Sequence, residues 1–156
     1  MFLVNRNTNM QVPLENIFFD VDILGTRIAR IQMVQSYINS STDTPLETQF
    51  FFPVDIDFAL HKIRVEYEDL SKGEKITVET KMEERKKAES IYEDSIVQGD
   101  TMAVLAQHVT VNKKSVISCN LGNFPPNSKA TLTCFMSTQL PVNTEGFAFR
   151  LPLCFI

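Results

Sequence analysis

The sequence predicts one mostly-β domain, an antiparallel β-sandwich with a single short α-helix inserted between strands at about 81–98. Two patterns lead to this fold class. Apolar and polar residues alternate with period two along most of the chain, whereas one charged segment spaces its apolar residues by three or four. The 156 residues fit one domain. Hydrophobic residues at 44% and charged residues at 22% are close to the globular average, which excludes wholesale disorder.

Alternation in the first half of the chain predicts a series of strands separated by turn residues. Strands are expected at 17–24, 28–39 and 46–52, followed respectively by Gly25, a polar loop at 40–45, and Pro53. A further strand has its apolar residues in one phase, at Ala59, Ile63, Val65 and Tyr67. The turn at 69–73 then leads into Ile76 and Val78, which predicts a hairpin.

The segment 81–98 has the other period. Its apolar positions form one stripe of a charged helix, at Ala88, Ile91, Tyr92, Ser95 and Ile96. Glu83 and Lys87 stand four residues apart, a spacing that supports a helical ion pair. Gly99 is the expected stop. Because so short a helix needs tertiary support, the stripe is expected to dock on a sheet.

Alternation resumes after the helix. Strands are expected at 102–107, 116–121, 129–140 and 146–151. Between the second and third of these, Gly122-Asn123 and Pro125-Pro126-Asn127 form a cluster of turn residues. Eight or more short strands with short turns favour a sandwich.

Motifs that would support catalysis or cofactor binding are missing from the sequence. None of the five glycines forms a phosphate-binding pattern, and neither CxxC nor HExxH occurs. His61, in a strand pattern, is interpreted as a packed or surface imidazole, and His108, which closes a strand, as exposed. Cys119, Cys134 and Cys154 are interpreted as reduced and buried, with a Cys119–Cys134 bridge as the alternative in an oxidising compartment. No local feature marks a cysteine as a nucleophile.

Acidic and aromatic groups have ordinary structural interpretations. The helix acids alternate with Lys and Arg, which favours a solvated face over a glycosidase pair; they are Glu83, Glu84, Glu89, Glu93 and Asp94. Strand acids spaced by two point outward and lack the EF-hand calcium pattern; they are Asp20, Asp22, Asp55 and Asp57. Phe50-Phe51-Phe52 indicates a buried strand rather than an aromatic binding platform.

Charge and hydropathy restrict the partners. A net charge of −4 argues against nucleic acid. No apolar run approaches the roughly 18 residues of a membrane span. Residues 1–9 have no secretory apolar segment, so a cytoplasmic location is expected. Asn39-Ser40-Ser41 is formally a glycosylation sequon, which carries little weight without a secretory signal.

Three separated segments resemble the VIT domain (vault protein inter-α-trypsin domain). Residues 45–55 are similar to its P-x-E-x-x-F-x-F-P-x-D signature, 86–92 with Gly99 to its K-x-A-x-x-x-Y…G helix, and 116–130 to its V-F-S-x-x-V-G-N-L-P-P-G-S-x segment. The resemblance spans about 13–152. It implies a VIT domain at 13–156 after an N-terminal extension at 1–12. No Asp-x-Ser-x-Ser motif occurs, so no von Willebrand A domain is included.

The resemblance implies a β-sandwich with no catalytic, cofactor-binding or metal-binding residues. Phe50 and Phe52 would fill the core, Pro53 would end a strand, and Ala88 and Tyr92 would dock the helix. The chain is most similar to the intracellular von Willebrand A domain proteins through 118–120 and 129–131. It departs from the family pattern at Asn127, where the family has Gly, and at 105–107, where Leu-Ala-Gln stands for Leu-Leu-Glu.

The function implied is a non-catalytic protein-interaction or scaffolding module. It would support an adjacent von Willebrand A domain or bind another protein, with no nucleic-acid partner and no membrane span. Two alternatives follow from other members of the family. One is an accessory domain of a vault-associated ADP-ribosyltransferase-like enzyme, and the other is part of a secreted matrix protein like the inter-α-trypsin inhibitor heavy chains.

Overall fold

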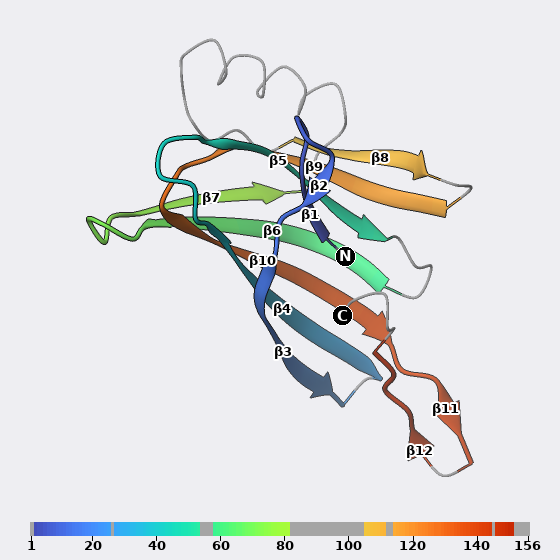
Figure 1. Cartoon of the computed structure of the whole chain (residues 1–156). Coiled ribbons are helices and arrows are strands. Elements are labelled where there is room, and N and C mark those ends of the chain that lie inside the picture. Colours follow the sequence, from blue (N-terminus) through green and yellow to red (C-terminus); the bar gives the residue numbers. More distant parts are fainter. Residues whose placement is uncertain are drawn as a thin grey trace.

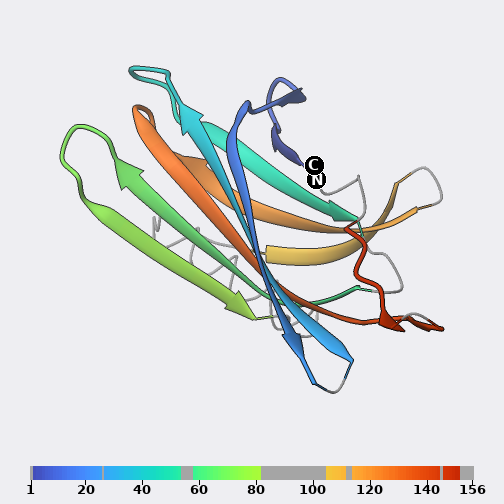
Figure 2. The same cartoon turned by 90° about the horizontal axis from the view of Figure 1, so that it is seen from below.

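The computed structural model describes residues 2–25, 27–53, 58–81, 105–111, 114–144 and 146–151. Two antiparallel five-stranded sheets face each other (Figure 1), as the turned view also shows (Figure 2). Sheet A contains, in spatial order, β2 (Met10–Gln11), β1 (Phe2–Asn5), β5 (Leu46–Pro53), β9 (Lys114–Phe124) and β8 (Leu105–Val111). Sheet B contains β3 (Leu14–Leu24), β4 (Ile28–Asn39), β10 (Ser128–Gln139), β6 (Phe58–Asp69) and β7 (Lys75–Lys81). The predicted β-sandwich is confirmed.

The hydrophobic core lies between the two sheets, where alternate residues of each strand point inward. Phe50 and Phe52 of sheet A are buried there, as predicted, with exposed fractions of 0% and 1%. Leu132 and Ile63 of sheet B meet this layer and are also fully buried. Burying large apolar side chains in this way is the main favourable term in folding.

Two tyrosines carry polar atoms into the core. The Tyr67 hydroxyl donates to the Leu121 carbonyl oxygen at 2.9 Å, which ties sheet B to sheet A. The Tyr37 hydroxyl donates to Gln35 Oε1 at 3.2 Å. Burial raises the pKa of both phenols, so both remain protonated and able to donate.

The central strands agree with the predicted alternation. β4 covers the predicted 28–39, and β5 ends at Pro53 as expected. In β10 the four residues predicted to share one face, from Ala130 to Met136, are all buried. β6 and β7 form the predicted hairpin.

A bulge in β6 corrects the predicted phase of that strand. Phe135 of β10 pairs with Lys62, whereas Met136 pairs with Leu60, so His61 is an extra residue. An inserted residue reverses the alternation. Phe58 is therefore buried while Ala59 is exposed, and the expectation that Ala59 shares the inward phase was wrong.

A second bulge corrects the interpretation of Gly122. This residue lies inside β9, where Thr48 pairs with Gly122 and Gln49 pairs with Asn120. Its φ of 69° is the left-handed conformation that glycine adopts without strain. Gly122 therefore bends a strand rather than turning the chain, whereas Asn127, at φ 46°, lies in the turn before β10.

Residues before the expected domain start also belong to sheet A. β1 pairs with β5, and it places Leu3 opposite Phe50 with no exposed surface. Val12, just after β2, is also buried in the core. Residues 2–12, within the expected N-terminal extension, thus contribute two strands.

Two predictions for the later part of the chain change. Lys81 pairs with Lys62 at the end of β7, so the prediction of a helix beginning at residue 81 was wrong. Residues 82–98, including Ala88 and Tyr92, lie outside the described ranges.

The strand predicted at 146–151 is shorter in the structure. Within it, strand pairing is limited to β12 (Gly146–Phe147), which pairs with β11 (Val142–Asn143). Phe149 and Leu151 instead pack against the core, which explains their alternation.

Candidate functional site

The outer face of sheet B, turned away from sheet A, bears a cavity of about 390 Å³. Besides the Gln32 amide and aliphatic side chains, its lining includes two carboxylates, a guanidinium, an imidazole, a phenyl ring and a hydroxyl, supplied by Asp20, Asp22, Arg30, His61, Phe135 and Ser137. His61 Nε2 lies 2.7 Å from Ser137 Oγ. The β6 bulge places the imidazole there, because His61 is its extra residue.

Among the described residues, no third group orients the His61 ring of this His61–Ser137 contact. A serine nucleophile needs a base that a third group orients, and donors for the developing oxyanion. Within the described ranges, His61 has no second hydrogen bond that would fix its ring. Ser137 lies in the central strand β10, which pairs with β4 on one side and β6 on the other. The contact therefore stabilises the bulge. His108 lies in β8, opposite Ile117.

Cys119 and Cys134 lie in the core, one in each sheet, and both are free and fully buried. Burial raises the pKa of Cys134 to about 12. Burial also raises the pKa of Cys119, and the neighbouring Cys134 raises it further. Since the thiolate is the reactive form, neither thiol is a nucleophile at neutral pH. The interpretation as buried cysteines is confirmed for these two, and Cys154 lies outside the described residues.

Asp20 and Asp22 point outward from β3, as the strand pattern predicted, and both are exposed. Asp22 lies opposite Arg30 of β4, whereas Asp20 lies opposite the neutral Gln32. Across the ranges that the structure describes, no three His, Cys, Asp or Glu side chains are grouped as metal ligands. The remaining acids considered for calcium or glycosidase chemistry, at 55, 57 and 83–94, lie outside those ranges.

Two cationic side chains lie over the Phe135 ring on the outer face of sheet B. Lys62 Nζ lies 4.8 Å from the ring centroid, and the Arg64 guanidinium carbon lies 5.4 Å from it. Both cations also donate to Glu79 of β7, at 3.0 Å and 2.6 Å. The hydrogen bond from Lys62, and then that from Arg64, lower the pKa of Glu79. The ion pairs that Lys62 and Arg64 form with Glu79 link β6 to β7. Because these pairs are partly exposed, each contributes little to the free energy of unfolding.

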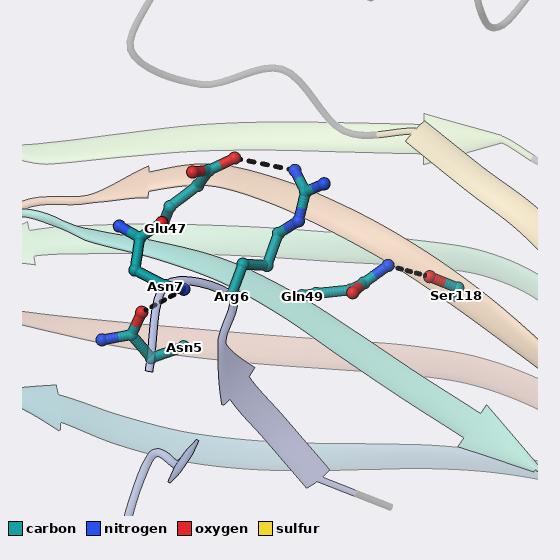
Figure 3. A network of polar contacts seen from close by, with 6 residues as sticks. All are labelled: Asn5, Arg6, Asn7, Glu47, Gln49 and Ser118. Carbon is teal, nitrogen blue, oxygen red and sulfur yellow. Dashed lines mark hydrogen bonds and ion pairs between the residues drawn. The ribbon is translucent and has the colours of Figure 1, made fainter. Parts of the chain in front are cut away.

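The outer side of sheet A has a polar network that joins β1, β5 and β9 (Figure 3). Arg6 forms an ion pair with Glu47 at 2.7 Å, and Gln49 Nε2 donates to Ser118 Oγ at 2.6 Å. Asn5 Oδ1 accepts from the backbone N–H of Asn7 at 3.0 Å, which shapes the turn after β1. The ion pair links the turn after β1 to β5, the amide–hydroxyl bond links β5 to β9, and these six residues assemble no reactive group.

Asn39 acts as a buried cross-link at the end of β4. Its Nδ2 donates to the carbonyl oxygens of Thr44, Phe124 and Pro125 at 3.2, 3.1 and 2.9 Å. Its Oδ1 accepts from the backbone N–H of Ser41 at 3.1 Å, and only 2% of the residue is exposed. Because Nδ2 is the atom that would carry a glycan, the folded domain has no room for sugar on this sequon.

The hairpin β11–β12 projects beyond the end of sheet B (Figure 1). Val142 and Phe147 are direct cross-strand partners, so both side chains lie on one face of the hairpin. They are 53% and 59% exposed. A two-stranded hairpin is marginally stable by itself, and exposed apolar side chains can mark an interaction site. The exposed Val142–Phe147 pair is therefore a candidate binding surface.

A cavity of about 630 Å³ separates this hairpin from the end of sheet B. Its walls combine apolar side chains with two arginines: Arg27, Phe58, Leu140, Val142, Phe149 and Arg150. We name the exposed pair and this cavity together the hairpin surface. The sequence did not predict this surface, because 146–151 was interpreted as one strand; Pro141 and Gly146 are the signals that could have divided it.

The chain matches one protein family model and several proteins of known sequence. The family model described as "Vault protein inter-alpha-trypsin domain" (VIT) matches residues 14–134. The chain is 34% identical over 142 residues to human von Willebrand factor A domain-containing protein 5A, which covers 90% of this chain. It is 33% identical over 135 residues to the mouse protein of that name, covering 86% of the chain. A von Willebrand factor A domain-containing protein of Dictyostelium discoideum is 24% identical over 147 residues, or 94% of the chain.

The matched regions form 17%, 16% and 16% of the human, mouse and Dictyostelium proteins, so the chain spans less than a fifth of each relative. Among the described residues, no helix has the length and hydropathy needed to cross a membrane. The family match covers most of both sheets, including β4, β5, β6 and β9. This chain therefore belongs to the VIT domain family.

Proposed function

We propose that this chain is a non-catalytic protein-interaction module that supports a neighbouring von Willebrand A domain or binds another protein. Its relatives are von Willebrand factor A domain-containing proteins by name, and the chain corresponds to less than a fifth of their length. A domain that forms part of such proteins needs a surface for its neighbours. The observation that carries the proposal is the exposed Val142–Phe147 pair on the projecting hairpin.

The hairpin surface has the composition of an interface. It combines the apolar side chains of Val142, Phe147 and Phe149 with the guanidinium groups of Arg27 and Arg150. Protein interfaces combine an apolar centre with a polar rim in which arginine is common. Burying two large apolar side chains that are more than half exposed gives a driving force for association.

We further propose that the domain works in a reducing, cytoplasmic compartment. The free and buried thiols of Cys119 and Cys134 support this location. The cross-link made by Asn39 supports it as well, because a glycan would have to replace an Nδ2 hydrogen at an atom that three carbonyl oxygens surround within 3.2 Å. The burial of Asn39 also disfavours the secreted matrix-protein alternative.

We also include residues 2–12 in the proposed domain, because Leu3 and Val12 lie in the core.

A binding experiment tests the interaction role. The purified chain is titrated with the von Willebrand A domain of the human relative, and amide hydrogen exchange is followed on the chain. The proposal predicts a complex with slowed exchange at 140–149. The Phe147→Asp variant is expected to weaken binding by about tenfold or more, the size of effect that a central apolar contact has on an interface.

Leu70→Asp is the matched control. Leu70 is also an exposed apolar residue, at 49%, but it lies in the β6–β7 turn at the opposite end of sheet B (Figure 1). Its substitution is expected to leave the affinity unchanged. An absence of complex, or equal losses in the two variants, would contradict the assignment to the hairpin surface.

A further inference from the structure

Among the described residues, the edge strand β3 has one unpaired side. β3 is an eleven-residue strand at the end of sheet B, as Figure 2 shows, and its strand partner is β4. Within the described ranges, no other strand pairs with Leu14–Leu24. Every second residue of such an edge directs its backbone N–H and C=O away from the sheet, which is a template for another strand.

The inward row of β3 is only partly covered. Ile17, Phe19 and Val21 pack against the core but keep intermediate exposure, and Ile23 is 56% exposed. The corresponding inward residues of β10, such as Leu132 and Cys134, are fully buried. An additional strand beside β3 would complete the burial of this row, with its own apolar residues at every second position.

The outward row sets the charge of a suitable partner. Asp20 lies opposite Gln32, so it has no cation across the strand, whereas Asp22 has Arg30. Neither carboxylate forms an ion pair with a described residue. Acidic residues on an edge strand oppose pairing with acidic strands, including β3 of a second copy in the register that sets Asp20 against Asp22. They favour a strand that carries Lys or Arg opposite Asp20.

We propose that the free side of β3 binds an extended segment of a partner protein by strand addition, with a basic residue opposite Asp20 and apolar residues beside Ile17, Phe19 and Val21. Backbone hydrogen bonds supply affinity in this mode, and the alternating side chains supply specificity. The cavity beside Asp20 and Asp22 leaves room for a long basic side chain. This inference extends the proposed interaction role to a second surface that is separate from the hairpin surface.

The test uses the full chain and a short blocked peptide that alternates Val and Lys. A peptide that alternates Val and Glu is the charge control. A third peptide has alternate backbone nitrogens of the Val-Lys sequence methylated, which removes the donors facing the sheet. The proposal predicts that the Val-Lys peptide binds at least about fivefold more tightly than the other two. It also predicts that amide exchange slows at Leu14–Leu24 and not along β7, the other edge of sheet B.

Two variants separate the site from general charge attraction. Asp20→Lys is expected to weaken binding of the Val-Lys peptide by about fivefold to tenfold, because attraction becomes repulsion. Glu74→Lys makes the same charge change at an exposed position in the β6–β7 turn and is expected to leave the affinity within about twofold. Phe147→Asp is also expected to be silent, which distinguishes this inference from the proposed function.

Several outcomes would overturn the inference. They are equal binding of the basic and acidic peptides, unchanged binding after backbone methylation, and protection that appears along β7. Sedimentation velocity of the chain without peptide is the last check. A dimer formed through β3 would assign the edge to a second copy of the chain instead.

Discussion

Strands β10 and β3 belong to the same sheet and have similar alternating sequences, yet their surroundings differ. β10 pairs along its length with β4 and β6, and its inward residues Leu132 and Cys134 are fully buried. β3 pairs with β4, and its inward residues keep part of their surface exposed. The position of a strand within the sheet, more than its sequence pattern, therefore decides whether its residues hold the fold together or remain open to partners.

Paired truncations give the largest test of this contrast. Leu132→Ala in β10 is expected to lower the free energy of unfolding by about 3–4 kcal/mol, because it leaves a cavity in a closely packed core. Ile17→Ala in β3 is expected to cost about 1 kcal/mol, since Ile17 is only partly buried. Urea unfolding followed by circular dichroism measures both. Similar costs for the two variants would mean that β3 is as well covered as β10.

A second contrast compares two asparagines near strand ends. Asn39→Ala is expected to cost about 2–3 kcal/mol, because it removes a buried side chain whose Nδ2 donates to three carbonyl oxygens. Asn123→Ala in β9 is the control, and it is expected to change stability by no more than about 0.5 kcal/mol because Asn123 is exposed. Thermal unfolding of both variants checks the prediction. A stable Asn39→Ala protein would show that the cross-link is dispensable.

Two glycines test the bulge in sheet A. Gly122→Ala is expected to cost about 1–2 kcal/mol, since alanine is strained at a φ of 69°. Gly25→Ala introduces the same methyl group in the β3–β4 turn, where the added Cβ would have no neighbouring atom within 4 Å. It is expected to be neutral or slightly stabilising, because it restricts the unfolded chain. Chemical denaturation distinguishes the two. A neutral Gly122→Ala variant would contradict the left-handed bulge.

The smallest expected effect concerns acid stability in the β6–β7 turn. Backbone N–H groups of Ser71 and then Lys72 donate to Asp69 Oδ1 at 2.8 and 3.2 Å, and these bonds lower the pKa of Asp69 below its ordinary value of 3.8. A depressed pKa stabilises the folded state above the ordinary value, and this contribution is lost as pH falls through the lowered pKa.

Asp69→Asn is therefore expected to reduce the loss of thermal stability between neutral pH and acid. Leu70→Ala in the same turn removes no carboxylate and should keep the wild-type pH profile. Identical profiles for all three proteins would remove Asp69 from the acid transition.

Much of the fold follows from local pattern, and the exceptions have physical causes. β4 and β10 were predicted closely because each strand has one buried face and therefore a clear alternation. Ala59 was placed in the wrong phase because a bulge shifts the register by one residue, which single-sequence alternation does not reveal. β1 was missed because it has only four residues and its burial depends on β5, more than forty residues away.

The candidate surfaces were less predictable than the fold. Asp20 and Asp22 were expected to point outward, but the sequence does not indicate that β3 lies at the end of a sheet, since strand order is a tertiary property. The exposed face of the hairpin depends on the pairing of Val142 with Phe147, which only the structure shows. Asn39 was noticed as a sequon, and its role as a cross-link depends on carbonyl groups 85 and 86 residues away.

Native-state amide hydrogen exchange on the isolated chain distinguishes the centre of sheet B, which holds the fold together, from its β3 edge, which stays open. We expect β10 amides to exchange only through global unfolding, and alternate amides of β3 to exchange orders of magnitude faster. Equal protection of every amide in β3 and β10 would show instead that the free side of β3 is already covered and that the edge is not open.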